Sequence, residues 1–215
     1  MYSGFITSRH SLPALGAHQR FDTAAYRITS PFFAEGSFPA LRDIVHFEGV
    51  NGPDGLKVKS PGRHEPGHLY NPETEVGDVP GLIHSHYAGL VDMLKTGDLV
   101  RAAFEAAWMA HYVCDGLTPA HHFPLDVKLA EHAASYSDKP RRYKHAVIVK
   151  GNGAADAVKR SWAVWGGKGL LTTHVNFELG VATALIGQRI KVKLDHVKLA
   201  EARAMGALPY FKQEA

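Results

Sequence analysis

Two histidine–carboxylate pairs with the same spacing are the residues of this chain best suited to do chemistry. His111 and Asp115 stand four residues apart at the end of an apolar stretch, and His174 and Glu178 repeat that spacing downstream. Residues four apart share one face of a helix. A buried imidazole beside a buried carboxylate is costly unless something compensates both. A divalent cation does so, because neutral imidazole and carboxylate are its ordinary ligands.

Cysteine usage limits the kind of metal site that this chain can build. The single Cys114 excludes an intrachain disulfide framework and a cysteine-based zinc cluster, so ligands must come from the 14 histidines and the acidic residues. One pair alone is typical of an ion pair on a helix face or a satisfied core histidine. Two pairs, together with His121 just after a turn at Gly116 and Pro119, favour a metal site instead.

Length and composition indicate a single domain over residues 1–215. The chain is 45% hydrophobic and 21% charged, as is usual for a globular protein. A formal charge of +3 suits an anionic substrate without requiring nucleic acid. No apolar run reaches membrane-spanning length. The first residues lack the charged start and apolar centre of a signal peptide, so the sequence predicts a cytoplasmic protein.

Apolar periodicity predicts a mainly α protein. Helices are expected over residues 17–28, 38–47, 81–96, 98–114, 126–136, 171–192 and 195–208, with a tail from Pro209 onward. Gly97 and Asp98 are a C-terminal cap followed by an N-cap, which predicts an antiparallel hairpin between the third and fourth helices.

A long loop over residues 49–80, rich in glycine and proline, contains Asp54 and His68. Metal ligation would give this loop a fixed shape, and a surface excursion with incidental histidines is the alternative. A second unusual segment, residues 137–170, is basic and includes a brief β-like run at 146–149. The simpler interpretation of these charges is a solvent-exposed basic surface. The more specific interpretation is a positively charged surface that attracts a phosphate-bearing substrate.

The order of these residues resembles the zinc-dependent phospholipase C / S1–P1 nuclease family. An aspartate stands 14 residues before the first histidine of the series, and the later motifs follow in the family's order: Asp54, His68-x-Tyr-x-Pro, His111-x-x-x-Asp115, Pro119-x-His121 and His174-x-x-x-Glu178. The resemblance covers about residues 17–123 and 171–190. It implies a mainly helical fold with three zinc ions at the bottom of a cleft.

By position, the resemblance implies that His68, His111 and Asp115 hold one zinc ion, with Asp54 beside it. Asp115 would bridge two metal ions, and Asp54 would orient or deprotonate the attacking water. These two aspartates are the expected catalytic residues.

The resemblance further implies a second zinc ion held by His121, His174 and Glu178. His18 looks like the N-terminal histidine of the family's third zinc site, and His10 is the weaker candidate. In the family that third site also uses the terminal residue, whereas this chain begins 17 residues before His18. Two or three zinc ions are therefore expected.

The implied function is that of a zinc-dependent phosphoric ester hydrolase, most like a phospholipase C, in which metal-activated water cleaves a phosphodiester. The expected partner is a phosphate ester, either a phospholipid head group or a nucleotide, with transient membrane-surface contact and no stable nucleic-acid partner. One alternative is a P1-type single-strand nuclease or 3′-nucleotidase, for which Trp162 and Trp165 could stack on bases. Another is a non-catalytic helical domain stabilised by metal.

Overall fold

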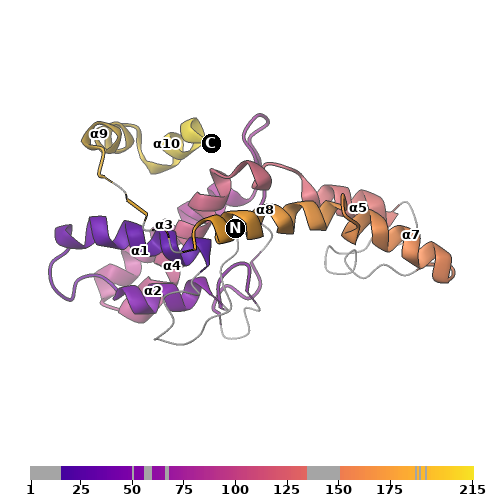
Figure 1. Ribbon diagram of the computed structural model, residues 1–215. Coiled ribbons are helices and arrows are strands. Elements are labelled where there is room, and N and C mark those ends of the chain that lie inside the picture. The colour runs from indigo at the N-terminus through magenta and orange to yellow at the C-terminus, as the bar shows by residue number, and fades with distance from the viewer. Residues whose placement is uncertain are drawn as a thin grey trace.

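The computed structural model describes residues 16–49, 51–55, 60–65, 68–134, 151–186, 188, 190–191 and 193–215, and this part of the chain is mainly helical (Figure 1). Its elements in chain order are α1 (Ala17–Thr29), η2 (Ser30–Phe32), α2 (Leu41–Glu48), β1 (Tyr70–Asn71), β2 (Val76–Gly77), α3 (Val79–Thr96), α4 (Leu99–Gly116), η3 (Pro119–His121), α5 (Leu125–Ala134), α7 (Ala154–Trp165), α8 (Leu170–Ala184), α9 (His196–Met205) and α10 (Ala207–Glu214). The strands β1 and β2 form a two-residue antiparallel ladder in the loop before α3.

The predicted hairpin of α3 and α4 is confirmed and forms the centre of the fold. Gly97 adopts the left-handed conformation, with φ of 78°, and ends α3, because a residue without Cβ takes this conformation at little cost. The Asp98 side chain then accepts a hydrogen bond from the Arg101 backbone N–H and begins α4.

The main core lies where α2 and α3 pack against α4. Its buried residues include Ile44, Ile83, Leu90, Phe104, Trp108 and Tyr112. The Trp108 indole is fully buried and donates a hydrogen bond to the Phe47 carbonyl at the end of α2. Gly62 packs directly on the Trp108 ring, since a Cβ at this position would lie 2.2 Å from a ring carbon. The loop before β1 is therefore anchored on the core.

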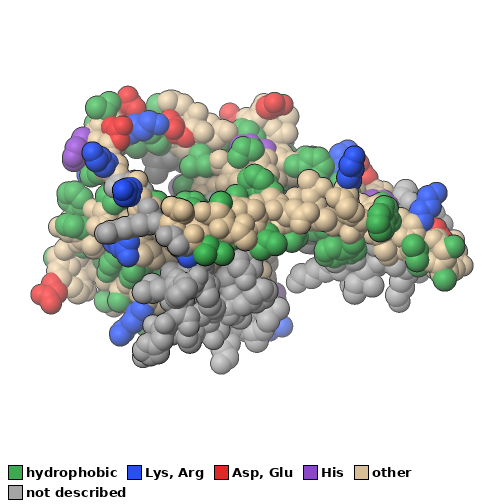
Figure 2. All heavy atoms as spheres, in the orientation of Figure 1, with side chains coloured by type: hydrophobic (Ala, Val, Ile, Leu, Met, Phe, Trp, Pro, Cys, Tyr) green, Lys and Arg blue, Asp and Glu red, His purple; other side chains and the backbone are tan. Residues whose placement is uncertain are grey.

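Helices α5 and α7 extend away from the body formed by α1 to α4, and α8 runs back toward that body (Figure 1). A second, smaller core of Leu125, Leu129, Val164 and Leu171 joins these three helices. This packing holds α8 against the rest of the chain. Figure 2 shows hydrophobic side chains spread along α7 and α8 on the visible face. Within the described residues, no helix has the length and apolarity that crossing a membrane requires.

Several details differ from the sequence-based prediction. The helix expected over 195–208 ends at Met205, because Gly206 adopts a φ of 89° before α10 begins. Residues from Pro209 onward were expected to be a tail, but they belong to α10, because proline in the first turn of a helix loses no hydrogen bond. Helix α7 lies within the basic segment 137–170, where no helix was predicted. The helix expected over 171–192 ends at Ala184. The β-like run at 146–149 lies outside the described residues.

Candidate metal centre

Eight side chains from six regions of the chain converge at one end of α4. Each was predicted as a metal ligand, and they come from the first turn of α1, the loop after α2, the segment before β1, the last two turns of α4, η3 and α8: His18, Asp54, His68, His111, Asp115, His121, His174 and Glu178. They form three overlapping groups, and within each group the possible ligand atoms lie within 4.8 Å of one another.

The first set of contacts joins the loop aspartate and histidine to α4. His68 Nε2 lies 3.3 Å from Asp54 Oδ1 and 3.1 Å from Asp115 Oδ2. His111 Nε2 lies 2.9 Å from Asp115 Oδ2, 3.7 Å from Asp54 Oδ2 and 3.4 Å from His68 Nε2. These four side chains are the donor set predicted for one zinc ion. The ligand atoms of Asp54, His111 and Asp115 also lie within 4.8 Å of that of His18, and the ligand atom of His68 lies within this distance of those of Asp115 and His121.

Asp115 is shared by four imidazoles. Its Oδ2 atom faces His68 and His111, while its Oδ1 atom lies 3.1 Å from His18 Nε2 and 3.3 Å from His121 Nε2. The Asp115 side chain is completely buried. A carboxylate with different imidazoles at its two oxygens has the arrangement expected of a ligand that bridges two cations.

The contacts on the far side of His121 connect α8 to the centre. His174 Nε2 lies 2.8 Å from Glu178 Oε1, and His121 Nε2 lies 3.5 Å from the same oxygen. The His121 and His174 rings meet edge to face, with centroids 5.0 Å apart. These three residues form the donor set predicted for a second zinc ion, and His121 places it next to Asp115.

Burial and the neighbouring charges set the protonation states that metal ligands need. Burial lowers the pKa of His111 to about 3, and the adjacent His18 contributes in the same direction. Burial alone would raise the pKa of Asp115, but the imidazoles of His111 and His18 outweigh it and hold that pKa well below its usual range. A neutral imidazole and an ionised carboxylate are the forms that bind a cation.

His68 departs from this pattern. Burial would lower its pKa, but hydrogen bonds and charges from Asp115 and Asp54 raise the pKa to about 9. Metal binding at this position would therefore release a proton from His68, since only the neutral ring can ligate.

A buried glutamate that the sequence analysis missed supports two of the histidines. Glu48, the last residue of α2, is fully buried, and its Oε1 atom lies 2.6 Å from His111 Nδ1 and 3.6 Å from His18 Nδ1. When ionised, a carboxylate at the outer nitrogen keeps the hydrogen on Nδ1 and leaves the lone pair of Nε2 facing the centre. The spacing of residues in α2 indicated this burial, because Glu48 follows Ile44 by four residues and so lies on the same, core-facing side of the helix.

A third histidine–carboxylate pair was also missed. Asp22 follows His18 by four residues on α1 and is buried, and burial raises its pKa to about 8. His10 lies outside the described residues. His84 is exposed, and His86 is buried away from the eight side chains, as expected for histidines outside the centre.

The donor set fits zinc. Imidazole nitrogen and carboxylate oxygen are its usual ligands when cysteine is absent. Within the described part of the chain, neither ring nitrogen of the buried His18 has a partner in hydrogen-bond geometry, although Nε2 lies 3.1 Å from Asp115 Oδ1. A bound cation would satisfy such a nitrogen.

Comparisons with protein-family models, with curated proteins and with solved structures find no match to this chain. The family resemblance of the sequence therefore stays a prediction. The functional argument rests on the arrangement of the side chains themselves.

Proposed function

We propose that this protein is a zinc-dependent phosphoric ester hydrolase that cleaves a phosphodiester, most like a phospholipase C. The observation that carries the proposal is the position of Asp115, a fully buried carboxylate with two imidazoles at each oxygen. Two or three cations at such a centre would account for the convergence of five histidines. Without them, several carboxylates would be buried at a cost of several kcal/mol each.

The residues divide into two sets of ligands around Asp115. Asp54, His68 and His111 would hold one ion with Asp115, since their ligand atoms contact one another in pairs. The second ion would be held by His121, His174 and Glu178. His18 would contribute to a third position beside Asp115. When bound, the zinc ions would polarise the phosphoryl group and acidify a water molecule.

Asp54 is the residue best placed to orient the attacking water. Its side chain is 26% exposed, whereas Asp115 is fully buried. Burial would raise the pKa of Asp54, but His111 and His68 outweigh it and lower this pKa, so the carboxylate is ionised at neutral pH. A carboxylate with a lowered pKa is a weak base, which favours accepting a hydrogen bond from the water over removing its proton.

Exposure along the centre supports a catalytic role over a purely structural one. His18, His111 and Asp115 are at most 1% exposed, but His174 and Glu178 are 17% and 16% exposed. A structural zinc site is normally closed by four protein ligands, while a catalytic site leaves a position open to solvent and substrate. Asp54 is 26% exposed, so a phosphate ester, either a soluble molecule or the head group of a lipid at a membrane surface, would enter on the side of the centre formed by Asp54 and α8.

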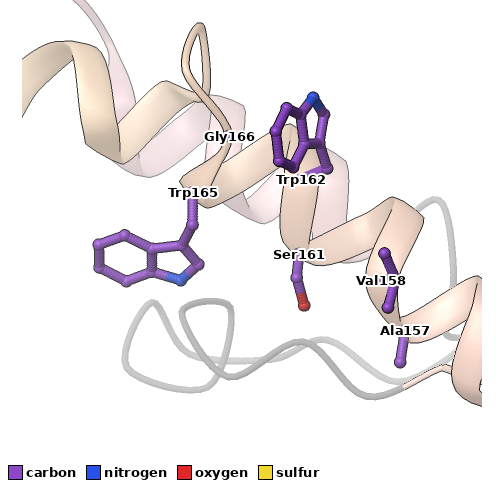
Figure 3. Close-up of a pocket in the computed structure, with 6 residues that line it drawn as sticks. All are labelled: Ala157, Val158, Ser161, Trp162, Trp165 and Gly166. Carbon is purple, nitrogen blue, oxygen red and sulfur yellow. The ribbon is translucent and has the colours of Figure 1, made fainter.

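A single-strand nuclease of the same chemistry is the second candidate, and an exposed tryptophan favours it. Trp162 on α7 is 71% exposed. With Trp165 it borders an open groove of about 290 Å³, whose other lining residues are Ala157, Val158, Ser161 and Gly166 (Figure 3). Helix α7 packs on α8, which carries His174 and Glu178. An exposed aromatic face on the helix that packs on α8 could stack on an unpaired base.

Hydrolysis assays with controlled metal content test the proposal. We expect zinc-loaded protein to hydrolyse a phosphodiester such as a choline phospholipid, to lose this activity in chelator and to regain it with added zinc. His174→Ala should lower both the zinc content and the rate. A folded, zinc-loaded protein that turns over neither lipid, nor single-stranded DNA, nor a nitrophenyl phosphodiester would reject the proposal in favour of a metal-stabilised domain without catalysis.

A further inference from the structure

Another buried histidine lies between two carboxylates, outside the eight side chains of the candidate centre. His86 on α3 is 4% exposed. Its Nδ1 atom lies 2.6 Å from Glu105 Oε2 on α4, and its Nε2 atom lies 3.0 Å from Glu65 Oε2 in the loop before β1. Ionised carboxylate oxygens only accept hydrogen bonds, so both ring nitrogens must carry hydrogen. His86 is therefore an imidazolium.

The neighbours of His86 extend these contacts into a chain of alternating charge. Arg101 Nε donates to Glu105 Oε1 at 2.7 Å, and the Tyr112 hydroxyl donates to Glu65 Oε2 at 2.9 Å. Arg101, Glu105, His86 and Glu65 together carry no net charge, which reduces the cost of burying them. The two carboxylates face opposite ring nitrogens and do not converge on one point, so this chain is not a metal site.

The same charges determine the pKa of His86. Burial would lower it, but hydrogen bonds and charges from Glu105 and Glu65 outweigh burial and raise this pKa. The groups that face the ring come from the loop and α4: Glu65, Glu105, Tyr112, Phe104 and Trp108. Glycine at position 89 leaves room for one of them, because a Cβ there would lie 2.8 Å from the Glu105 carboxyl carbon.

The chain of contacts leads to the candidate metal centre through the loop. Glu65 stands three residues before His68, and the Tyr112 ring lies 5.5 Å from the His68 ring. His68 belongs to no helix or strand, so its position depends on what anchors the loop. Glu65 ties that loop to α3 through His86 and to α4 through Tyr112.

We propose that His86 is a positioning residue: its doubly hydrogen-bonded imidazolium holds Glu65 in place and so orients His68 for metal binding. This inference rests on the metal centre of the proposed function. When His86 loses its proton, one of its two carboxylates loses a donor and the anchor weakens. Zinc affinity should therefore depend on the proton of a side chain that never touches the metal.

The test compares His86→Gln with His84→Gln, a matched change at an exposed position of the same helix. Zinc affinity is measured by competition with a chelator, near neutral pH and in alkaline buffer. Near neutral pH, His86→Gln should bind zinc up to about tenfold more weakly than the wild type. This is the low end of the effect of removing a group bonded directly to a metal ligand, because His86 acts on His68 through Glu65. His84→Gln should match the wild type.

The pH dependence separates positioning from a general loss of structure. Protons that compete for the ligands act equally on both proteins, so they cancel in the ratio of the two affinities. This ratio should approach one in alkaline buffer, where the wild type also loses the His86 proton. A ratio that stays constant with pH would overturn the proposal and leave His86 a packing role.

A second variant keeps the proposal testable if His86→Gln fails to fold. Glu65→Gln changes a 25% exposed loop side chain and leaves the contact of His86 with Glu105 intact. It should weaken zinc binding in the same pH-dependent way. Unchanged affinity in a folded variant would overturn this proposal alone. Wild-type protein that binds no zinc would overturn both proposals, and zinc binding without hydrolysis would reject only the proposed function.

Discussion

Replacing Glu48 with glutamine removes a charge next to two of the proposed ligands while keeping almost the same shape. Burial raises the pKa of the Glu48 carboxyl well above its usual range, and the carboxylates of Asp22, Asp54 and Asp115 raise it further. Without metal, folding therefore favours the protonated form of Glu48, and glutamine resembles that neutral form. The free energy of unfolding without metal should change by less than ~1 kcal/mol.

Metal binding should reverse the protonation preference of Glu48. Cations beside His111 and His18 would favour the ionised form of Glu48, whose carboxylate then accepts a short, charge-assisted hydrogen bond from His111 Nδ1, now at 2.6 Å from Oε1. Glutamine cannot supply that charge. Losing an outer carboxylate of this kind weakens metal affinity by about 10- to 100-fold, or ~1.4–2.8 kcal/mol.

The assay measures two quantities on the same preparation: zinc affinity by chelator competition and thermal unfolding of the chelator-treated protein. Asp43→Asn is the control, because Asp43 lies on the same helix with its side chain 46% exposed. Zinc affinity of Glu48→Gln equal to that of the control would refute the reasoning. A large loss of stability without metal would also contradict it, since it would mean that the buried carboxyl is ionised before metal binds.

Three further substitutions have defined outcomes. Burial raises the pKa of Asp22 to about 8, so the folded protein keeps a proton that the unfolded chain releases near pH 4. The free energy of unfolding should therefore fall as pH rises between these two values, by up to ~1.4 kcal/mol per pH unit. Asp22→Asn should flatten this slope in denaturant titrations. Gly62→Ala would place a Cβ 2.2 Å from the Trp108 ring and should destabilise the fold by ~1–3 kcal/mol in thermal unfolding, whereas Gly81→Ala, with open space around it, should not. If the protein acts on single strands, Trp162→Ala should raise the KM for single-stranded DNA about tenfold with no change for a nitrophenyl phosphodiester, and an unchanged KM for DNA would exclude stacking at this position.

Local spacing explains which parts of the fold the sequence predicted. The turn at Gly97 and Asp98 depends on two adjacent residues, and the α3–α4 hairpin follows from it. The pairs on α4 and α8 were found because a spacing of four residues has the same meaning in any helix. The prediction of a tail from Pro209 onward was wrong, because a proline in the first turn of a helix gives up no hydrogen bond and α10 can include it.

Local spacing does not predict contacts between residues that are far apart in the sequence. The sharing of Asp115 by His18, His68, His111 and His121 joins segments separated by up to about a hundred residues, and no local pattern encodes it. Glu48 was missed because an acidic residue at the end of a short helix usually faces solvent. The contacts of His86 depend on a loop and two helices at once, so the position of this residue early in α3 did not reveal them.

Anomalous diffraction at the zinc absorption edge tests the central claim most directly. For crystals grown with zinc, we predict one peak among Asp54, His68, His111 and Asp115. We predict a separate peak among His121, His174 and Glu178. Peaks only at other surface positions, or none at all in a folded protein with these side chains placed as described, would contradict the proposed metal centre.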